Sequence, residues 1–114
     1  MKHRMRLETR TRGNVRVLEL EGSFVLGSGD SELRETLDQL LEEGTARIVI
    51  NVKHVHILDS AALGEMIAGT CKAHDKRGAV KIAAPPPRLR EVLGRFPENF
   101  EVFETEEDAV AAFR

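Results

Sequence analysis

The chain has 114 residues, of which 41% are hydrophobic and 32% are charged. This length fits one compact domain, and the composition is too apolar for a disordered chain, so we expect a single domain over residues 1–114. The 17 Lys and Arg residues and 19 Asp and Glu residues give a net charge of −2, which argues against a bulk electrostatic attraction to nucleic acid or to anionic membranes.

The residue inventory excludes further classes. Cys71 is the single cysteine, so an intramolecular disulfide and a multi-cysteine metal centre are both ruled out. Only Phe supplies aromatic rings, which disfavours a stacking platform for nucleic acid. The first six residues lack the apolar stretch of a signal peptide, and no apolar run reaches the ~20 residues of a membrane span. We therefore expect a cytoplasmic protein without nucleic-acid binding or direct membrane insertion.

The N-terminal part predicts a hairpin and a helix. Apolar Met5 and Leu7 alternate with charged residues over 4–9, residues 12–14 indicate a turn, and 15–21 form a second strand. A Gly/Ser-rich stretch follows over 22–30, with the apolar segment Phe24-Val25-Leu26 inside it. Asp30 or Ser31 can cap the next helix. Its apolar stripe comprises Leu33, Thr36, Leu37, Leu40 and Leu41, and Gly44 is expected to end the helix in a left-handed conformation.

The remaining elements alternate between strand and helix. Residues 48–50 are a β-branched run typical of a strand that is covered on both faces, and extended structure continues to Leu58. Helical spacing then runs from Ser60 to about Gly78. A strand is expected over 79–83. The next helix starts at the triple proline and carries Leu89, Val92, Leu93 and Phe96. A strand over 100–103 follows, and the chain ends with a helix behind the capping box Thr105–Asp108.

This order is β-β-α-β-α-β-α-β-α, which predicts an α/β fold. The opening hairpin and the alternation that follows predict a mixed, mostly parallel sheet. The basic N-terminal residues are interpreted as a solvated strand face, and the acidic residues 98–108 as a solvated surface with a charged first helical turn.

Ser60 is the residue with the clearest chemical potential. It stands where a strand ends and a helix begins, which is where sites are commonly built in open α/β sheets. Free N–H groups and the helix dipole stabilise an anion there, so a phosphoryl group on Ser60 would be tolerated. The alternative is that Asp59 or Ser60 only caps the helix.

The helix after Ser60 carries an unusual outer face. A projection of 100° per residue places Leu63, Met66, Ile67, Thr70 and His74 on the core side, and Ala61, Glu65, Ala68, Gly69 and Lys72 on the outside. Gly64 and Gly69 each cost about 1 kcal/mol relative to Ala in a helix, so a small outer face favours close approach of another protein. The alternative is that these glycines allow neighbouring helices to pack.

The segment from Ile48 to Gly64 resembles the STAS domain of anti-sigma factor antagonists. The resembling residues are Ile48-Val49-Ile50-Asn51-Val52 and Val55-His56-Ile57-Leu58-Asp59-Ser60-Ala61-Ala62-Leu63-Gly64. The resemblance implies a mixed sheet with helices mainly on one side. It also implies that the unphosphorylated protein binds an anti-sigma factor that is a serine kinase of the ATP-binding, histidine-kinase-like type, and that phosphorylation of the serine after the aspartate breaks this complex. That serine aligns with Ser60.

The sequence departs from the family pattern at two places. Ala61-Ala62 replaces the usual Ser/Thr-Gly, which leaves Ser60 as the only hydroxyl of the motif. An acidic residue that is common in the family shortly after the glycine that ends the second strand is missing, because Gly22 is followed by Ser23-Phe24-Val25. A STAS protein that binds a partner without being phosphorylated is therefore also considered.

Other chemistries are poorly supported. No nucleophile elbow, Walker loop or Rossmann loop occurs, so we expect no enzyme and no cofactor. A phosphoaccepting Asp59 would need an acidic pair for Mg²⁺, which the first strands do not supply. His54 and His56 are two apart on an extended segment but have no nearby third ligand, so no metal is expected. His74 and Cys71 are interpreted as core residues of their helix.

These observations predict a regulatory binding module that is a monomer or a weak dimer. Its role is expected to be that of an anti-sigma factor antagonist that phosphorylation at Ser60 switches off. The alternative is a non-switching STAS subunit of a stress-sensing scaffold or of a membrane transport complex. The predicted partner surface comprises Asp59, Ser60, Ala61, Ala62, Gly64, Glu65, Ala68 and Gly69, with the Phe24-Val25-Leu26 loop beside it.

Overall fold

A computed structural model describes residues 5–113 of the chain and contains the predicted order of elements. The N-terminal elements are β1 (Arg6–Arg12), β2 (Val15–Phe24), α1 (Asp30–Glu42) and β3 (Arg47–Leu58). The C-terminal elements are α2 (Ser60–Asp75), β4 (Ala79–Ala83), α3 (Pro87–Leu93), β5 (Glu101–Phe103) and α4 (Glu106–Ala111).

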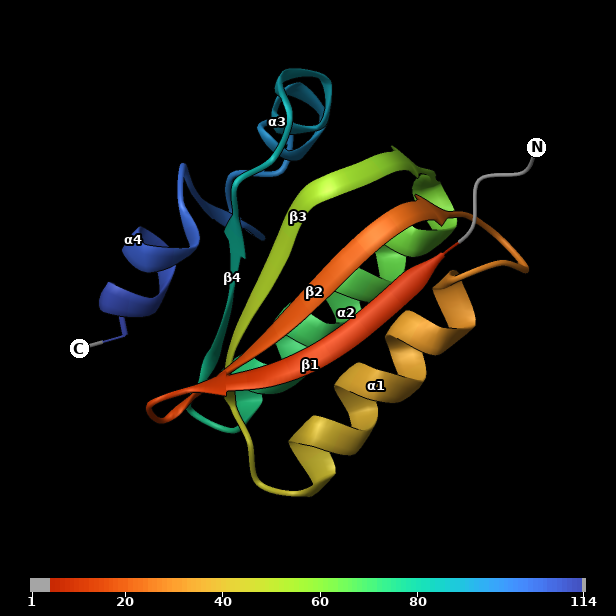
Figure 1. The fold of residues 1–114 in the computed structure, drawn as a ribbon. Coiled ribbons are helices and arrows are strands. Elements are labelled where there is room, and N and C mark those ends of the chain that lie inside the picture. Colours follow the sequence, from red (N-terminus) through yellow and green to blue (C-terminus); the bar gives the residue numbers. More distant parts are fainter. Residues whose placement is uncertain (1–4, 114) are drawn as a thin grey trace.

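The strands form one sheet in the order β1-β2-β3-β4-β5 (Figure 1). β1 is antiparallel to β2 and pairs Arg12 with Val15 across a tight turn, in which Gly13 adopts φ 62°. β2, β3, β4 and β5 are parallel to one another. The predicted mixed, mostly parallel sheet with an N-terminal hairpin is therefore confirmed.

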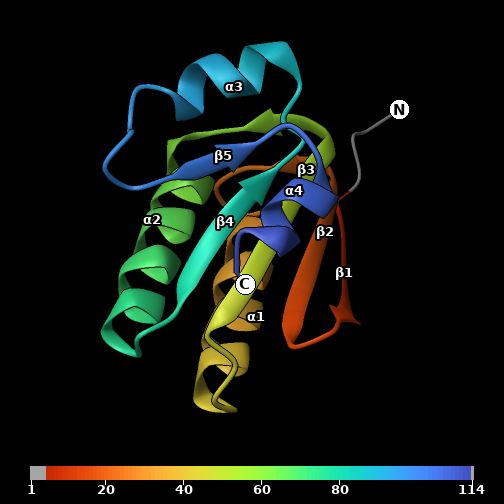
Figure 2. The same ribbon diagram turned by 90° about the vertical axis from the view of Figure 1, so that its left-hand side faces the viewer.

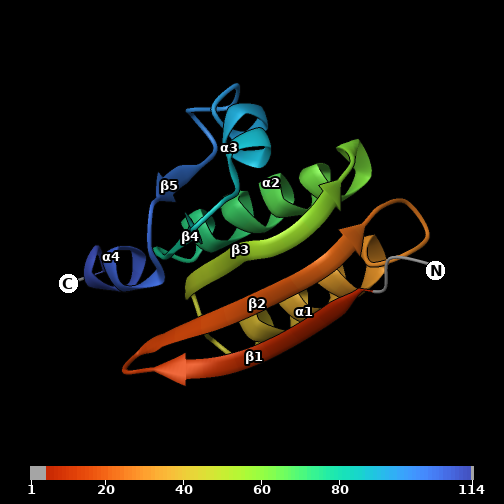
Figure 3. The ribbon, with the colours of Figure 1, turned by 45° about the horizontal axis from the view of Figure 1, so that its top comes forward.

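The helices are distributed unequally over the two faces of this sheet. α1 and α2 lie side by side on one face, whereas the short α4 lies on the opposite face (Figures 1 and 2). α3 lies beyond the end of the sheet at which β3 and β4 finish (Figure 3). This arrangement confirms helices packed mainly on one side, and it leaves much of the second face open around α4.

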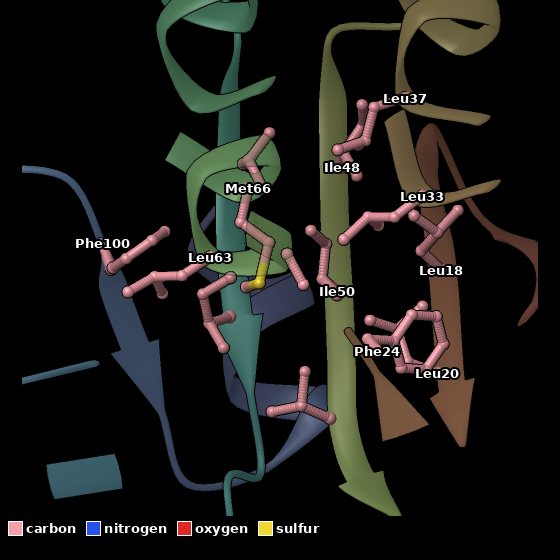
Figure 4. Packing of buried hydrophobic residues seen from close by; sticks show 14 of the residues in the cluster. Leu18, Leu20, Phe24, Leu33, Leu37, Ile48, Ile50, Leu63, Met66 and Phe100 are labelled. Atoms are coloured by element: carbon pink, nitrogen blue, oxygen red, sulfur yellow. The ribbon is translucent and has the colours of Figure 1, made fainter. Parts of the chain in front are cut away.

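The main core fills the space between the sheet and the α1–α2 layer. Leu33 and Leu37 from α1 meet the β2 and β3 side chains, and Met66 from α2 reaches the same layer (Figure 4). All of these side chains are at most 1% exposed. Burial of this apolar area is the principal source of stability, at about 25 cal/mol for each Å² removed from water.

A smaller apolar cluster covers part of the other face. It consists of Val15, Val17, Val49, Ala83 and Ala109, with Ala109 contributed by α4. Ile48, Val49 and Ile50 are consequently all 0% exposed, because successive side chains of β3 point to opposite, covered faces. The prediction that this run is covered on both faces is confirmed.

Several predicted boundaries are wrong by a few residues. The first strand extends to Arg12 rather than ending near residue 9, and the prediction for residue 4 lies outside the described residues. β2 continues through Phe24, because Gly22 and Ser23 still pair with β3 across a register shift. Residues 48–50 and 55–58 belong to one strand, and α3 ends three residues before Phe96.

The cap of α1 also differs from the prediction. The N-cap is Gly29, at φ 98°, whereas Asp30 is the first helical residue. Asp30 instead accepts a hydrogen bond at 2.9 Å from the N–H of Gly27 and thereby closes the preceding turn. A Cβ on Gly29 would lie 2.9 Å from the Phe24 ring, so both space and φ favour glycine here.

The predicted inner and outer faces of α2 are partly wrong. Gly69 is buried, whereas Cys71 and His74 are exposed. The reason is that α2 packs against α1 as well as against the sheet, so its buried arc is rotated toward α1 relative to a helix with one neighbour. A Cβ on Gly69 would lie 2.8 Å from Leu37 Cδ1, which confirms the alternative that this glycine allows two helices to pack.

Candidate functional site

Ser60 is the first residue of α2 and is exposed. The preceding residue, Asp59, is the N-cap: its carboxylate accepts a hydrogen bond at 3.1 Å from the N–H of Ala62. The cap therefore belongs to Asp59, and the Ser60 side chain is not used to start the helix. A hydroxyl on the first turn of a 16-residue helix lies near the positive end of the helix dipole, where added negative charge is stabilised.

Asp59 also connects Ser60 to the loop between β2 and α1. Its second carboxylate oxygen accepts a hydrogen bond at 2.9 Å from the N–H of Leu26, and its own N–H donates to the Phe24 carbonyl at 3.2 Å. The Leu26 hydrogen bond, followed by that from Ala62, holds the pKa of Asp59 below its usual value. Both oxygens of Asp59 are thus engaged in holding two loops together.

Two large apolar side chains lie exposed beside this junction. Leu26 is 76% exposed and Ile57 is 46% exposed, and these are the exposed large hydrophobic residues of the described chain. Leu26 is attached to the start of α2 through Asp59, and Ile57 precedes Asp59 by two residues at the end of β3. Their position gives the surroundings of Ser60 an apolar character.

The first turns of α2 continue this surface. Gly64 is exposed, and a Cβ added there would meet nothing within 4 Å. Ala61 and Ala68 are half-buried, as is Glu65, whose carboxylate lies 3.6 Å from the Arg34 guanidinium of α1. We call the set Leu26, Ile57, Ser60, Ala61, Gly64, Glu65 and Ala68 the Ser60 surface.

Three residues predicted for the partner surface lie inside the protein. Phe24 and Ala62 are 0% exposed and belong to the main core, and Gly69 faces Leu37. Val25 is half-buried. The sequence does not show that Phe24 still belongs to β2 or that Ala62 and Gly69 lie on the side of α2 that packs against the rest of the protein.

An ionic cluster around the buried Glu106, which no sequence motif indicates, lies on the opposite face of the sheet. The Glu106 carboxylate of α4 accepts hydrogen bonds from Arg10 at 2.6 and 2.7 Å, from Arg12 at 2.9 Å and from Asn51 at 2.9 Å. The Arg10 contacts are the main reason that the pKa of Glu106 falls to about 2, and the same contacts raise the pKa of Arg10. The prediction that the acidic residues 98–108 form a solvated surface is wrong at Glu106, which is buried and paired with two arginines of β1.

The structure contains no assembled metal site within residues 5–113. His54 and His56 are both exposed on β3, and no third ligand joins them in a group that could hold a metal ion. Among the described helices, none is long and apolar enough to cross a membrane. The chemically notable position at this end of the sheet is therefore the exposed serine within an apolar surround.

Comparison with solved structures places the fold among anti-sigma factor antagonists. A Mycobacterium paratuberculosis anti-sigma factor antagonist matches with a TM-score of 0.81 and 20% identity, over 95% of this chain and 92% of that one. Bacillus SpoIIAA in its phosphorylated form matches with a TM-score of 0.72 and 21% identity, over 96% and 99%. A STAS domain protein from Planctomyces limnophilus matches with a TM-score of 0.75 and 16% identity, over 95% and 97%.

The sequence itself also identifies a family. No protein with a curated function matches the chain. A family model described as "Mlab, STAS domain" matches residues 7–96, which include β1 to α3 and the whole Ser60 surface. This match covers well over half of the 114 residues, and the chain belongs to the STAS domain family.

Proposed function

We propose that the chain is an anti-sigma factor antagonist that works by partner switching. In its unphosphorylated form it binds an anti-sigma factor that is a serine kinase of the ATP-binding, histidine-kinase-like type, and the sigma factor is released. Phosphorylation of Ser60 ends this complex. The observation that carries the proposal is the exposed Ser60 at the start of α2, next to the exposed side chains of Leu26 and Ile57.

The position of Ser60 suits a switch of binding rather than of folding. A phosphoserine carries about −1.5 to −2 charges, and at a helix N-terminus this charge is compatible with the fold. In a complex, however, the same charge would be placed in an interface that includes the exposed apolar side chains of Leu26 and Ile57, where an unmatched charge is costly. Phosphorylation should therefore weaken the complex and leave the free protein folded.

The similar structures support this assignment at the level of the fold. The related proteins are described as anti-sigma factor antagonists, and SpoIIAA has been solved in unphosphorylated and phosphorylated forms. In the proposal, the Ser60 surface contacts the kinase, Asp59 positions Ser60 and Leu26, and Phe24, Ala62 and Gly69 support the surface from within. ATP belongs to the kinase, so the chain acts without a cofactor and is not an enzyme.

Phosphorylation by a serine kinase of this class tests the proposal. The chain is incubated with the kinase and ATP, and the modified residue is located by mass spectrometry. We expect modification at Ser60 and its loss in Ser60→Ala. Ser28→Ala is the matched control, because Ser28 is an exposed serine in the neighbouring loop. Modification of Ser28 instead, or equal modification of both variants, would contradict the assignment.

A second candidate is a STAS subunit that docks without a switch, in a stress-sensing scaffold or a membrane transport complex. One observation favours it: the acidic residue that is common in the family shortly after the glycine of the second strand is absent. Gly22 is followed by Ser23, which is 6% exposed and has no hydrogen-bond partner for its Oγ among the described residues. This candidate predicts that Ser60→Asp binds the partner as tightly as the wild type. The proposed switch predicts that Ser60→Asp binds the partner clearly more weakly than the wild type.

A further inference from the structure

A basic hollow of about 450 Å³ lies at the end of the sheet opposite Ser60. Three turns form its walls: the β1–β2 hairpin, the turn between α1 and β3, and the turn between α2 and β4, which Figure 1 shows gathered at one end of the molecule. Its cationic side chains are Arg16, Arg47, Lys76 and Arg77. The proposed function uses none of them.

The parallel sheet brings these turns together. β2, β3 and β4 all begin at this edge, where Arg16 pairs with Ile48 and Arg47 pairs with Ala79. The Ala79 N–H donates to the Ala46 carbonyl at 2.7 Å, which fastens the second turn to the third. A Cβ on Gly78 would lie only 2.0 Å from that carbonyl oxygen, so the contact requires glycine. The walls of the hollow are therefore fixed by backbone contacts.

The charge of the hollow is not neutralised by the protein. No Asp or Glu lines it, and none of its four cations forms an ion pair with another of residues 5–113. The hollow beside α4 is different: it has about 520 Å³ and also contains an arginine, but there Arg10 is neutralised by Glu106. An uncompensated group of four cations in one concave site attracts anions.

Arg16 supplies a second, independent observation. Its Nε is shielded from solvent and has no acceptor among the described residues. Within residues 5–113, its side chain makes one hydrogen bond, from an outer guanidinium nitrogen to Thr9 Oγ1 at 3.4 Å. The Arg16 guanidinium therefore has few acceptors within the described protein, and an anionic oxygen in the hollow that Arg16 lines is a partner for its outer nitrogens.

We propose that the basic hollow binds the phosphate groups of a small, multiply phosphorylated compound. Guanidinium groups recognise phosphate oxygens in pairs, and several fixed cations favour several linked phosphates over a single one. The lining contains no aromatic side chain, so a nucleobase would find no stacking partner. The phosphate chain, rather than an attached nucleoside, is therefore the recognised group.

Calorimetric titration of the full chain with sodium tripolyphosphate tests this site, at an ionic strength of about 0.15 M. We expect saturable binding, similar affinity for ATP, and amide shift changes in the three turns by NMR. The double variant Arg47→Gln/Lys76→Gln should bind at least ten times more weakly. The matched control Arg90→Gln/Arg95→Gln removes the same charge from exposed positions in and after α3 and should bind as the wild type does.

Four results would overturn the proposal: no saturable tripolyphosphate binding, equal losses in both double variants, ATP binding more than ten times tighter than tripolyphosphate, or binding of a single-stranded oligonucleotide without binding of tripolyphosphate. Circular dichroism melting of both double variants separates lost binding from lost folding. Ser60→Asp should retain tripolyphosphate affinity, because the two sites lie at opposite ends of β3. Failure of this proposal is thus distinguishable from failure of the Ser60 switch.

Discussion

Neutralising Glu106 should destabilise the protein clearly more than neutralising the exposed acid next to it, Glu107. The carboxylate is only 10% exposed and joins α4 to β1 and β3 through Arg10, Arg12 and Asn51. Glu106→Gln keeps the size of the side chain but removes the charge that pairs with two guanidinium groups. The arginines would then face a neutral amide in a largely buried site.

The size of the expected loss of stability follows from the pKa of Glu106, which falls from 4.5 to about 2. This difference corresponds to about 3 kcal/mol of stability for the ionised carboxylate. Because the folded-state pKa is the lower one, the contribution is complete above about pH 4.5 and is lost as the pH falls toward 2. At pH 3 it should be about 1 kcal/mol, by the same relation.

Urea unfolding of the wild type and of Glu106→Gln at pH 7 and at pH 3 measures both values. Glu107→Gln is the control, because Glu107 is 74% exposed and lies 3.8 Å from Arg12. The free energy of unfolding of Glu107→Gln should be lower than that of the wild type by less than about 0.5 kcal/mol at either pH. The reasoning is refuted if the two variants lose the same small amount at pH 7, or if the loss in Glu106→Gln is as large at pH 3 as at pH 7.

Three further predictions concern the two ends of α2 and the exposed loop. Gly69→Gln should lower the free energy of unfolding by about 1–3 kcal/mol because its side chain would meet Leu37, whereas Gly64→Gln should raise it by up to about 1 kcal/mol. Chemical unfolding of the two variants measures this difference, and equal effects would contradict the packing role of Gly69. Leu26→Asp should lower the affinity for the partner at least tenfold, measured by calorimetry, and leave the melting temperature unchanged. An unchanged affinity would show that Leu26 is not part of the interface. Gly78→Ala should lower the melting temperature by several degrees, since its Cβ would overlap the Ala46 carbonyl; an unchanged value would contradict the close contact between the two turns.

Much of the fold was predictable because its signals are local. The apolar stripe that includes Leu33 and Leu37 predicted α1, the β-branched run 48–50 predicted the central strand, and Gly44 ended the first helix with a positive φ of 92°. Element order then determined the sheet, because alternating strands and helices are joined by right-handed crossovers. Boundaries were less accurate, since β2 continues through Gly22 by pairing with a distant strand.

The missed features depend on contacts between distant parts of the chain. Gly69 looked like part of an outer face because the sequence does not show that α2 has two neighbours. Glu106 looked like one of several solvated acids, although its partner Arg10 lies 96 positions away in sequence. The Phe24-Val25-Leu26 loop was expected beside the Ser60 surface, but the hydrogen bond from the Leu26 N–H to Asp59 that holds it there is not visible in the sequence.

The affinity of the unphosphorylated and the Ser60-phosphorylated chain for the same kinase-type anti-sigma factor tests the central claim most directly. Both forms are titrated by calorimetry, after circular dichroism has established that both are folded. The partner-switching account predicts at least a tenfold weaker complex for the phosphorylated form, because a doubly charged group replaces a hydroxyl beside Leu26 and Ile57. Equal affinities of the two forms would contradict it.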